Sequence, residues 1–117
     1  MFERNHDCIF CTIAAGELGT VFRYESERVV AFDDVTPQAP THVLVIPRTH
    51  LPDLTALAAD HSGLATELIQ AATQVAADKG IADTGFRVLV NVGEDAGQTV
   101  DHVHLHMLGG GTLARMG

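Results

Sequence analysis

Residues 101–108 read Asp-His-Val-His-Leu-His-Met-Leu and carry the strongest pattern in the chain. Three of the seven histidines stand there at every second position, with apolar residues between them. A spacing of two is the period of a β-strand, whose successive side chains point to opposite faces of a sheet. The pattern therefore predicts a strand that presents His102, His104 and His106 on one face and buries the alternate apolar residues on the other.

Four interpretations of this histidine row are open at this point. The row is an exposed strand face, a metal site, a catalytic histidine flanked by two that orient it, or a division of labour in which one ring binds metal and another does the chemistry. Imidazole is the commonest metal ligand in proteins. Neighbouring same-face residues on a strand stand about 7 Å apart, so one ion reaches two of them only with some adjustment.

Length and charge restrict the class of protein. At 117 residues, 46% of them hydrophobic, the chain is expected to form a single domain over 1–117 with its own core. A formal net charge of -8, from 15 acidic and 7 basic residues, argues against a nucleic-acid partner, which would need a basic face. A small phosphate ligand remains compatible, held by backbone N–H groups, glycines and histidines.

The beginning of the chain and its cysteines bear on location and metal binding. Residues 1–7 are polar and no run of about 20 apolar residues occurs, so we expect a cytoplasmic protein without a membrane partner. The only cysteines, Cys8 and Cys11, form a C-x-x-C pair, which is typical of a metal half-site or a redox couple. Two histidines from elsewhere would complete a tetrahedral zinc site.

Hydrophobic periodicity predicts an α+β fold with an antiparallel sheet, because strands and helices are segregated rather than alternating. The expected elements are a short helix over 8–15 capped by Asp7, a hairpin of strands 21–24 and 28–32, a central strand 42–46, a helical region from Leu54 to Gly80, a strand 86–92 and the histidine strand 102–108.

Two further histidines flank the central strand. His42 opens this strand and His50 follows it, and taken singly each is better explained by a structural role than by a ligand role. A zinc site made of the two cysteines, His50 and one histidine of the row is sterically reasonable. Sequence spacing alone does not establish it.

Several separated motifs together resemble the histidine triad (HIT) superfamily. Residues 102–108 fit its His-x-His-x-His-x-x signature, and residues 8–11, 34–42, 45–50 and 97–99 look like its Hint branch. The resemblance extends from Cys8 to Gly110. It implies a five-stranded antiparallel sheet with one long and one short helix, which pairs into a ten-stranded sheet in a homodimer.

The resemblance also implies an activity, the hydrolysis of nucleoside 5′-phosphoramidates with a purine preference. His104 would be the nucleophile that attacks the α-phosphorus and forms a nucleotidyl-histidine, which water then hydrolyses. His106 and His42 correspond to positions beside the phosphate, where they would stabilise negative charge or assist the leaving amine. The expected ligands are a purine nucleoside monophosphate or phosphoramidate and a second copy of the chain.

The remaining site residues are assigned by the same resemblance. Asp34 would accept hydrogen bonds from the ribose hydroxyls. Contacts to the phosphate and the leaving group would come from Asn91, Gly97, Gln98 and Thr99. The base pocket would be lined by Phe10, Leu18, Phe32 and Val35, for which ordinary core packing is the alternative. A closed, structural zinc site would be formed by Cys8, Cys11, His50 and His102, with no organic cofactor.

This assignment favours the fourth interpretation of the row, with His102 structural and His104 catalytic. Two alternative functions stay open. One is a dinucleoside polyphosphate hydrolase or nucleotidyl transferase of the same superfamily, which differs in the leaving group. The other is a zinc-stabilised nucleotide-binding or interaction protein whose catalysis is incidental.

Overall fold

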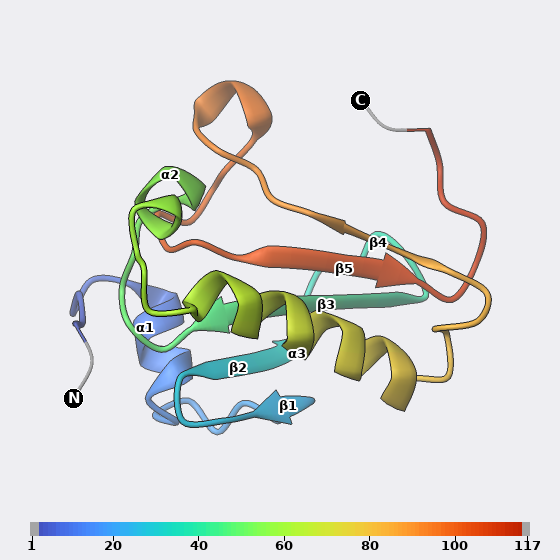
Figure 1. Cartoon of the computed structure of the whole chain (residues 1–117), viewed down its shortest axis with the longest axis horizontal. Helices are drawn as coiled ribbons and strands as arrows, with labels where there is room; N and C mark the ends of the chain where they lie inside the picture. Colours follow the sequence, from blue (N-terminus) through green and yellow to red (C-terminus); the bar gives the residue numbers. More distant parts are fainter. Residues whose placement is uncertain (1–2, 116–117) are drawn as a thin grey trace.

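The computed structural model describes residues 3–115, in which five strands form one antiparallel sheet beside three α-helices and a 3-10 turn (Figure 1). In chain order the elements are α1 (Ile9–Ala14), β1 (Tyr24–Glu25), β2 (Val29–Asp33), β3 (Thr41–Pro47), α2 (Leu54–Ala58), α3 (Leu64–Asp78), β4 (Phe86–Leu89), η1 (Glu94–Ala96) and β5 (Leu105–Gly109).

The strand order in the sheet is β1-β2-β3-β5-β4, and every neighbouring pair is antiparallel. β3 lies in the centre, where Val45 pairs with Leu105 and Leu44 pairs with His106. The expected α+β fold with a five-stranded antiparallel sheet is confirmed. The sheet order also places the histidine strand, β5, between the most apolar strand, β3, and β4, so neighbouring strands cover both edges of β5.

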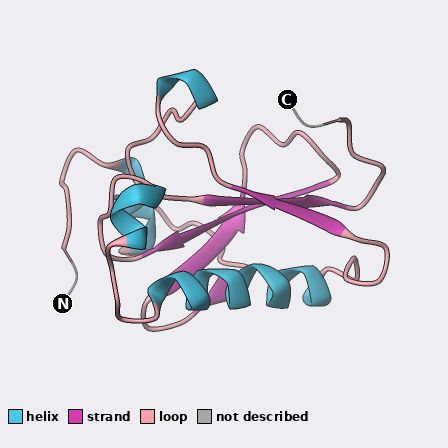
Figure 2. Ribbon diagram, turned by 45° about the horizontal axis from the view of Figure 1, so that its top comes forward, coloured by secondary structure: helices cyan, strands magenta, loops and turns pink. Residues whose placement is uncertain are grey.

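Each face of the sheet packs against a different helix, as the alternation of side chains requires. Figure 2 shows α3 lying along one face, where its leucines and alanines meet the apolar side chains of β2, β3 and β5. The opposite face carries α1, whose Phe10, Cys11 and Ala14 pack on the other side chains of β2 and β3. β3 is thus buried on both faces, as its continuous apolar run predicts. The side chains of His42 and His106 project on the α1 side, because they alternate with the residues that face α3.

The helices differ from the sequence prediction in two details. Cys8, not Asp7, is the N-cap of α1, and its Sγ accepts a hydrogen bond from the backbone N–H of Cys11 at 3.4 Å. The helical region after Leu54 is divided into α2 and α3 by residues 59–63, and Gly63, in a left-handed conformation with φ 87°, is the N-cap of α3. The described residues therefore contain two short helices beside the long one, where one was expected. None of the helices within residues 3–115 is long and apolar enough to cross a membrane.

The histidine strand is shorter than predicted, since β5 begins at Leu105 and not at His102. Continued pairing from Val45 and Leu105 would bring Pro47 opposite Val103. Pro47 has no N–H to donate, so the ladder ends there. The N–H of Val103 instead donates to the carbonyl oxygen of Leu51 at 2.7 Å. The first two histidines of the row thus lie on irregular backbone, outside the regular strand.

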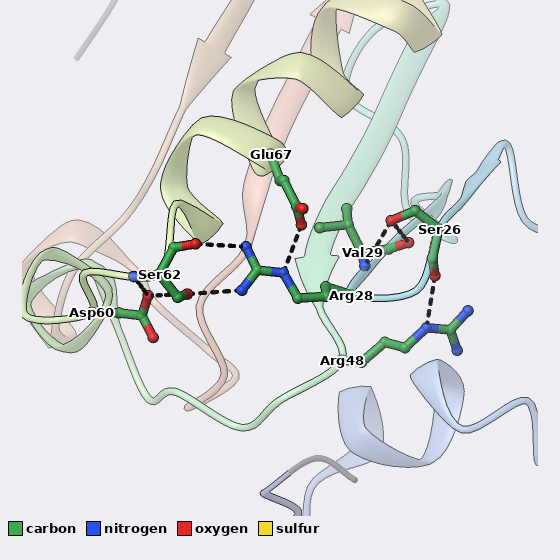
Figure 3. A network of polar contacts seen from close by, with 7 residues as sticks. All are labelled: Ser26, Arg28, Val29, Arg48, Asp60, Ser62 and Glu67. Carbon is green, nitrogen blue, oxygen red and sulfur yellow. Dashed lines mark hydrogen bonds and ion pairs between the residues drawn. The ribbon is translucent and has the colours of Figure 1, made fainter.

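Two arginines join the layers on either side of the sheet (Figure 3). Arg28 donates from Nε to Glu67 at 2.9 Å and from Nη1 to the hydroxyl of Ser62 at 2.8 Å, which ties the β1–β2 hairpin to the beginning of α3. Arg48 donates from Nε to the carbonyl oxygen of Ser26 at 3.1 Å and from Nη1 to that of Ala14 at 2.6 Å. The second arginine therefore satisfies a carbonyl at the end of α1 and holds that helix against the hairpin.

Candidate active site and metal-binding group

A cavity of about 430 Å³ opens beside the histidine strand. This volume lies in the range of sites that bind small molecules. The lining residues come from the 34–38 loop, β3, the 91–99 loop, the paired strands β4 and β5 and the backbone just before β5: Asp34, Thr36, Gln38, His42, Leu89, Asn91, Gly97, Thr99, His104, His106 and Leu108. Polar groups from segments far apart in the sequence therefore converge on one hollow whose walls also include two leucines.

The hydrogen bond of His104 determines which of its nitrogens is reactive. Nδ1 of this buried ring lies 2.8 Å from the carbonyl oxygen of His102, so Nδ1 carries the proton and donates it. In the neutral ring Nε2 then has a free lone pair. A histidine with one nitrogen held by a carbonyl and the other free is suited to attack an electrophile.

His42 and His106 form a chain with a defined direction. The backbone N–H of Gln38 donates to Nδ1 of His42 at 3.0 Å, so the proton of His42 lies on Nε2. That Nε2 is 2.9 Å from Nδ1 of His106 and donates to it, which leaves the proton of His106 on its own Nε2. Among the described residues, this Nε2 is a buried polar atom without a hydrogen-bond partner. It is therefore a donor available to a ligand in the cavity.

Burial lowers the pKa of His106 to about 4, with smaller contributions from the neighbouring rings of His104 and His42. The ring is consequently neutral near pH 7. The centroids of the His104 and His106 rings are 5.0 Å apart. A free lone pair and a free N–H thus lie on adjacent rings that line the same cavity.

Asp34 extends this chain. Its Oδ2 is 3.4 Å from Nε2 of His42, while its Oδ1 accepts from the backbone N–H of Thr36 at 2.8 Å. The nearest donor atoms of Asp34, His42 and His106 lie within 4.8 Å of one another, a spacing that also suits a metal ion. The proton on Nε2 of His42 leaves no lone pair for an ion, however. We therefore interpret the three residues as a hydrogen-bonded chain.

A second group consists of Cys8, Cys11, His50 and His102, hereafter the tetrad, whose donor atoms all lie within 4.8 Å of one another. Nδ1 of His102 is 3.4 Å from Sγ of Cys8, 3.5 Å from Sγ of Cys11 and 3.2 Å from Nδ1 of His50. Ligand atoms around a tetrahedral ion with Zn–N and Zn–S bonds would be roughly 3.3 to 3.8 Å apart. The donor set and its spacing therefore fit a metal ion.

The hydrogen bond of His102 prepares its ring for this role. Nε2 is 2.8 Å from the carbonyl oxygen of Pro47 and donates to it, so Nδ1 presents a lone pair to the tetrad. Burial lowers the pKa of His102 to about 4, and burial raises the pKa of the Cys11 thiol. A metal cation would suit this place, because it binds a neutral imidazole and displaces the protons of the two buried thiols.

Most residues assigned to catalysis and phosphate binding line the cavity, and Gln98 is the exception among them in the described chain. Its side-chain oxygen accepts from the backbone N–H of Gly93 at 3.0 Å. Its amide nitrogen donates to the carbonyl oxygens of Pro52 at 2.8 Å and Val100 at 3.0 Å. Gln98 therefore braces the loop that carries Thr99, and its phosphate contact stays a prediction.

The four residues assigned to the base pocket lie outside the cavity lining in the described part of the chain. Phe10 and Phe32 are buried and pack edge to face with ring centroids 5.8 Å apart. Leu18 and Val35 are exposed, with 54% and 97% of their surfaces accessible. The structure thus shows packing for the two phenylalanines and places the other two on the surface, and contact with a base stays a prediction for all four.

Sequence reasoning missed Thr36, Gln38, Leu89 and Leu108 as cavity residues. Thr36 and Gln38 lie in the loop between Asp34 and His42. Because both ends of this loop are site residues, the loop itself is expected to lie near the site. Leu89 is opposite His106 in the β4–β5 pair. Its role depends on strand register, for which the sequence carries no local signal.

Comparisons with known proteins identify the family of the chain. The HIT domain family matches residues 15–113, a segment that contains the histidine row and His50 but begins after the two cysteines. An uncharacterized HIT-like protein of Synechocystis sp. is 47% identical over 104 residues, which cover 89% of this chain and 90% of that protein. The purine nucleoside phosphoramidase of Escherichia coli is 37% identical over 110 residues, which cover 94% of this chain and 92% of that protein.

Solved structures are similar over nearly the full length. A histidine triad protein from Clostridium difficile superposes with a TM-score of 0.92 at 39% identity and covers 97% of this chain and 99% of its own. A HIT family hydrolase from Clostridium thermocellum superposes with a TM-score of 0.91 at 40% identity, with coverage of 97% and 98%. The chain therefore shares its fold with these proteins and resembles them in sequence.

The lowered pKa of His106 predicts how stability depends on pH. The folded chain keeps this ring neutral down to about pH 4, whereas the unfolded chain binds a proton below its ordinary pKa of 6.5. The unfolded state binds more protons between these values, so the free energy of unfolding falls as the pH falls from 6.5 to about 4. Urea denaturation across this window should show a weaker pH dependence in His106→Gln than in the wild type. His61→Gln, a substitution of an exposed histidine, is the control, and an unchanged slope in His106→Gln would contradict the assignment.

Proposed function

The chain belongs to the HIT domain family, and on this basis we propose that it hydrolyses the P–N bond of purine nucleoside 5′-phosphoramidates. HIT family hydrolases and a purine nucleoside phosphoramidase are among its relatives. The observation that carries the proposal is the pairing of the free Nε2 of His104 with the unpartnered N–H of His106 on one cavity wall. The first group can attack phosphorus and the second can donate to what leaves it.

In the first step, Nε2 of His104 forms a bond to the α-phosphorus and the bond from phosphorus to the amine breaks. The His104 ring becomes a cation in this nucleotidyl intermediate, and the His102 carbonyl that accepts from Nδ1 stabilises that charge. The departing nitrogen keeps the bonding pair and takes one proton. Binding of an anionic phosphate favours an additional proton from solvent on His106, whose Nδ1 can take it when the N–H of His42 turns to the Asp34 carboxylate 3.4 Å away. We assign delivery of a proton to the departing nitrogen to Nε2 of His106.

In the second step, water attacks the phosphorus and the bond to His104 breaks, which returns the lone pair to Nε2. One proton of the water passes to His106 and restores the His42–His106 pair, so that the products are the nucleoside monophosphate and the free amine. The chain from Gln38 through His42 keeps His106 in the orientation in which its Nε2 faces the ligand. Gly97 and Thr99 line the same cavity and would contact the phosphate oxygens.

The nucleoside would bind next to Asp34, whose carboxylate lies at the cavity and can accept from ribose hydroxyls. Val35, the neighbouring residue, is exposed and offers apolar surface for a base. A dinucleoside polyphosphate would be attacked by the same nucleophile and would release a different leaving group. Comparing the rates on phosphoramidate and dinucleotide substrates therefore distinguishes phosphoramidate hydrolysis from dinucleotide hydrolysis and nucleotidyl transfer. The single domain over 1–117 and the cytoplasmic location remain predictions.

Release of AMP from adenosine 5′-phosphoramidate tests the catalytic assignment. His104→Ala removes the nucleophile, and kcat/KM should fall by about four orders of magnitude or more. His61→Ala, at an exposed histidine away from the cavity, is the matched control and should retain the wild-type rate. If His104→Ala kept a rate close to that of the wild type, the mechanism would be wrong. A folded wild type that cleaves only dinucleotides would assign a different leaving group, and one that binds AMP without turnover would assign a binding role.

We further propose that the tetrad binds zinc as a structural ion. Two sulfur and two nitrogen donors are a set that zinc prefers, and four protein ligands leave no open position for substrate. Bound zinc would contribute folding energy by joining α1 to the segments that follow β3 and precede β5. The ion would hold the thiols as thiolates, since a coordinated cysteine loses its proton.

Metal analysis of the purified and zinc-loaded chain tests this assignment. We expect one zinc per chain in the wild type and in His61→Ala, and none in the double variant Cys8→Ser, Cys11→Ser. Removal of zinc by a chelator should lower the wild-type Tm by about 10 °C, because an ion that binds only the folded state stabilises it. Undiminished zinc content in the double variant would exclude the tetrad as the site.

The homodimer is also a proposal, and the shape of the sheet supports it. β1 at one edge has two residues, whereas β4 at the other edge has four and presents an unpaired backbone. Val88 in β4 has 41% of its surface exposed. Pairing of two β4 edges about a two-fold axis would join two five-stranded sheets into one of ten strands.

Sedimentation should therefore give a mass of twice 12.5 kDa for the wild type. Val88→Glu places like charges near the two-fold axis and should shift the protein toward the monomer. Val21→Glu is the control, because Val21 is more exposed, at 70%, and lies outside the β4 edge. A Val88→Glu variant that remains dimeric at low micromolar concentration would place the interface elsewhere.

A further inference from the structure

Phe10 stands between the two cysteines of the tetrad and touches the catalytic histidine. Its ring centroid is 5.1 Å from that of His104, at an interplanar angle of 84°, and 6.0 Å from that of His102 at 79°. Both contacts are edge to face, a geometry that aromatic rings prefer because it opposes the positive edge of one to the negative face of the other. The same residue therefore packs against one ring of each site.

The backbone around Phe10 leaves it little freedom. Cys8 caps α1 and accepts from the N–H of Cys11, so the three residues lie in one tight turn. Phe10 and Cys11 are buried in the same cluster against β2 and β3. Once the two sulfur atoms share an ion with His50 and His102, the ring between them is held from both sides.

His102 provides a second connection between the sites. Nδ1 of His102 faces the other three residues of the tetrad, while the carbonyl oxygen of His102 accepts a hydrogen bond from Nδ1–H of His104. A hydrogen bond to a carbonyl fixes which nitrogen is protonated but allows the imidazole plane to rotate about it. The edge-to-face contact with Phe10 restricts that rotation. The two constraints together determine where Nε2 of His104 points.

We propose that Phe10 is a positioning residue that holds the His104 ring in its reactive orientation. The inference rests on the proposed function, because it concerns the nucleophile assigned there. It differs from the base-pocket role, in which Phe10 would contact the nucleoside. Loss of a substrate contact chiefly raises KM, whereas a misdirected nucleophile lowers kcat.

The experiment compares Phe10→Leu with Phe22→Leu in the zinc-loaded protein. Phe22 is a partly buried residue that packs against the same apolar cluster as the buried Phe10, and it makes no ring contact with a histidine in the described chain. Phe22→Leu therefore controls for the same substitution in this cluster, with less packing lost than in Phe10→Leu. For Phe10→Leu we expect kcat to fall about ten-fold relative to Phe22→Leu, with KM changed less than about two-fold and zinc content unaltered. Phe10→Met is the second variant if Phe10→Leu fails to fold, because methionine fills a similar volume.

A measurement without substrate keeps this inference separate from the proposed function. In zinc-loaded protein labelled with nitrogen-15 in histidine, at about pH 8, where an unperturbed imidazole is neutral, NMR distinguishes the two tautomers. The wild type and Phe22→Leu should show His104 as a single Nδ1–H form with sharp ring resonances. Phe10→Leu should keep the Nδ1–H form but show broadened ring resonances, because its His104 ring rotates about the hydrogen bond to His102. If the wild type cleaves no phosphoramidate, the proposed function fails while this comparison still tests the positioning role.

Three results would overturn the inference. Equal kcat in Phe10→Leu and Phe22→Leu would reduce Phe10 to core packing. A loss confined to KM would assign Phe10 to the base pocket. Ring resonances of His104 in Phe10→Leu as sharp as those of the wild type would show that the hydrogen bond to His102 orients the ring without help.

Discussion

The hydrogen bond from Nε2 of His102 to the carbonyl oxygen of Pro47 is the contact on which both sites depend. Pro47 ends the ladder between β3 and β5 because it has no N–H, and its carbonyl accepts from an imidazole. That bond places the proton of His102 on Nε2 and leaves Nδ1 to the tetrad. The carbonyl of the same residue then faces His104 and fixes its protonated nitrogen. One buried residue thus sets the chemistry of two neighbouring groups.

Hydrogen positions distinguish two clusters that look alike by distance. The donor atoms of the tetrad and those of Asp34, His42 and His106 are each gathered within 4.8 Å. In the first cluster, His102 turns a lone pair toward two sulfur atoms, which suits a cation. In the second, the N–H of Gln38 forces the proton of His42 onto the nitrogen that faces His106. The chemistry of each cluster therefore follows from one backbone group outside it.

Much of the site was predictable from residue type and spacing. The alternation in 102–108 indicated a row of histidines backed by the core, and Val103, Leu105 and Met107 are indeed buried on the α3 side. Asp34, His42 and Asn91, which the resemblance assigns to the site, line the cavity, and their roles toward a ligand stay predictions. The position of Gln98 did not follow from its residue type, because an amide side chain in a glycine-rich loop is equally able to bind a ligand or brace the loop. The carbonyl oxygen of Pro52, 46 positions away in the chain, accepts from its amide and so favours bracing.

The amino-acid order alone carries the class of fold, the central apolar strand and the residue types needed for a histidine nucleophile and a four-ligand metal site, because periodicity and chemical identity are local properties. It does not carry the division of the histidine row at Leu105, the protonated nitrogen of each ring or the contact between Phe10 and His104. These features arise when β3 pairs with β5 and α1 packs on their common face. A tautomer depends on which carbonyl or N–H lies within 3 Å of a ring, and folding brings those groups together from distant parts of the chain.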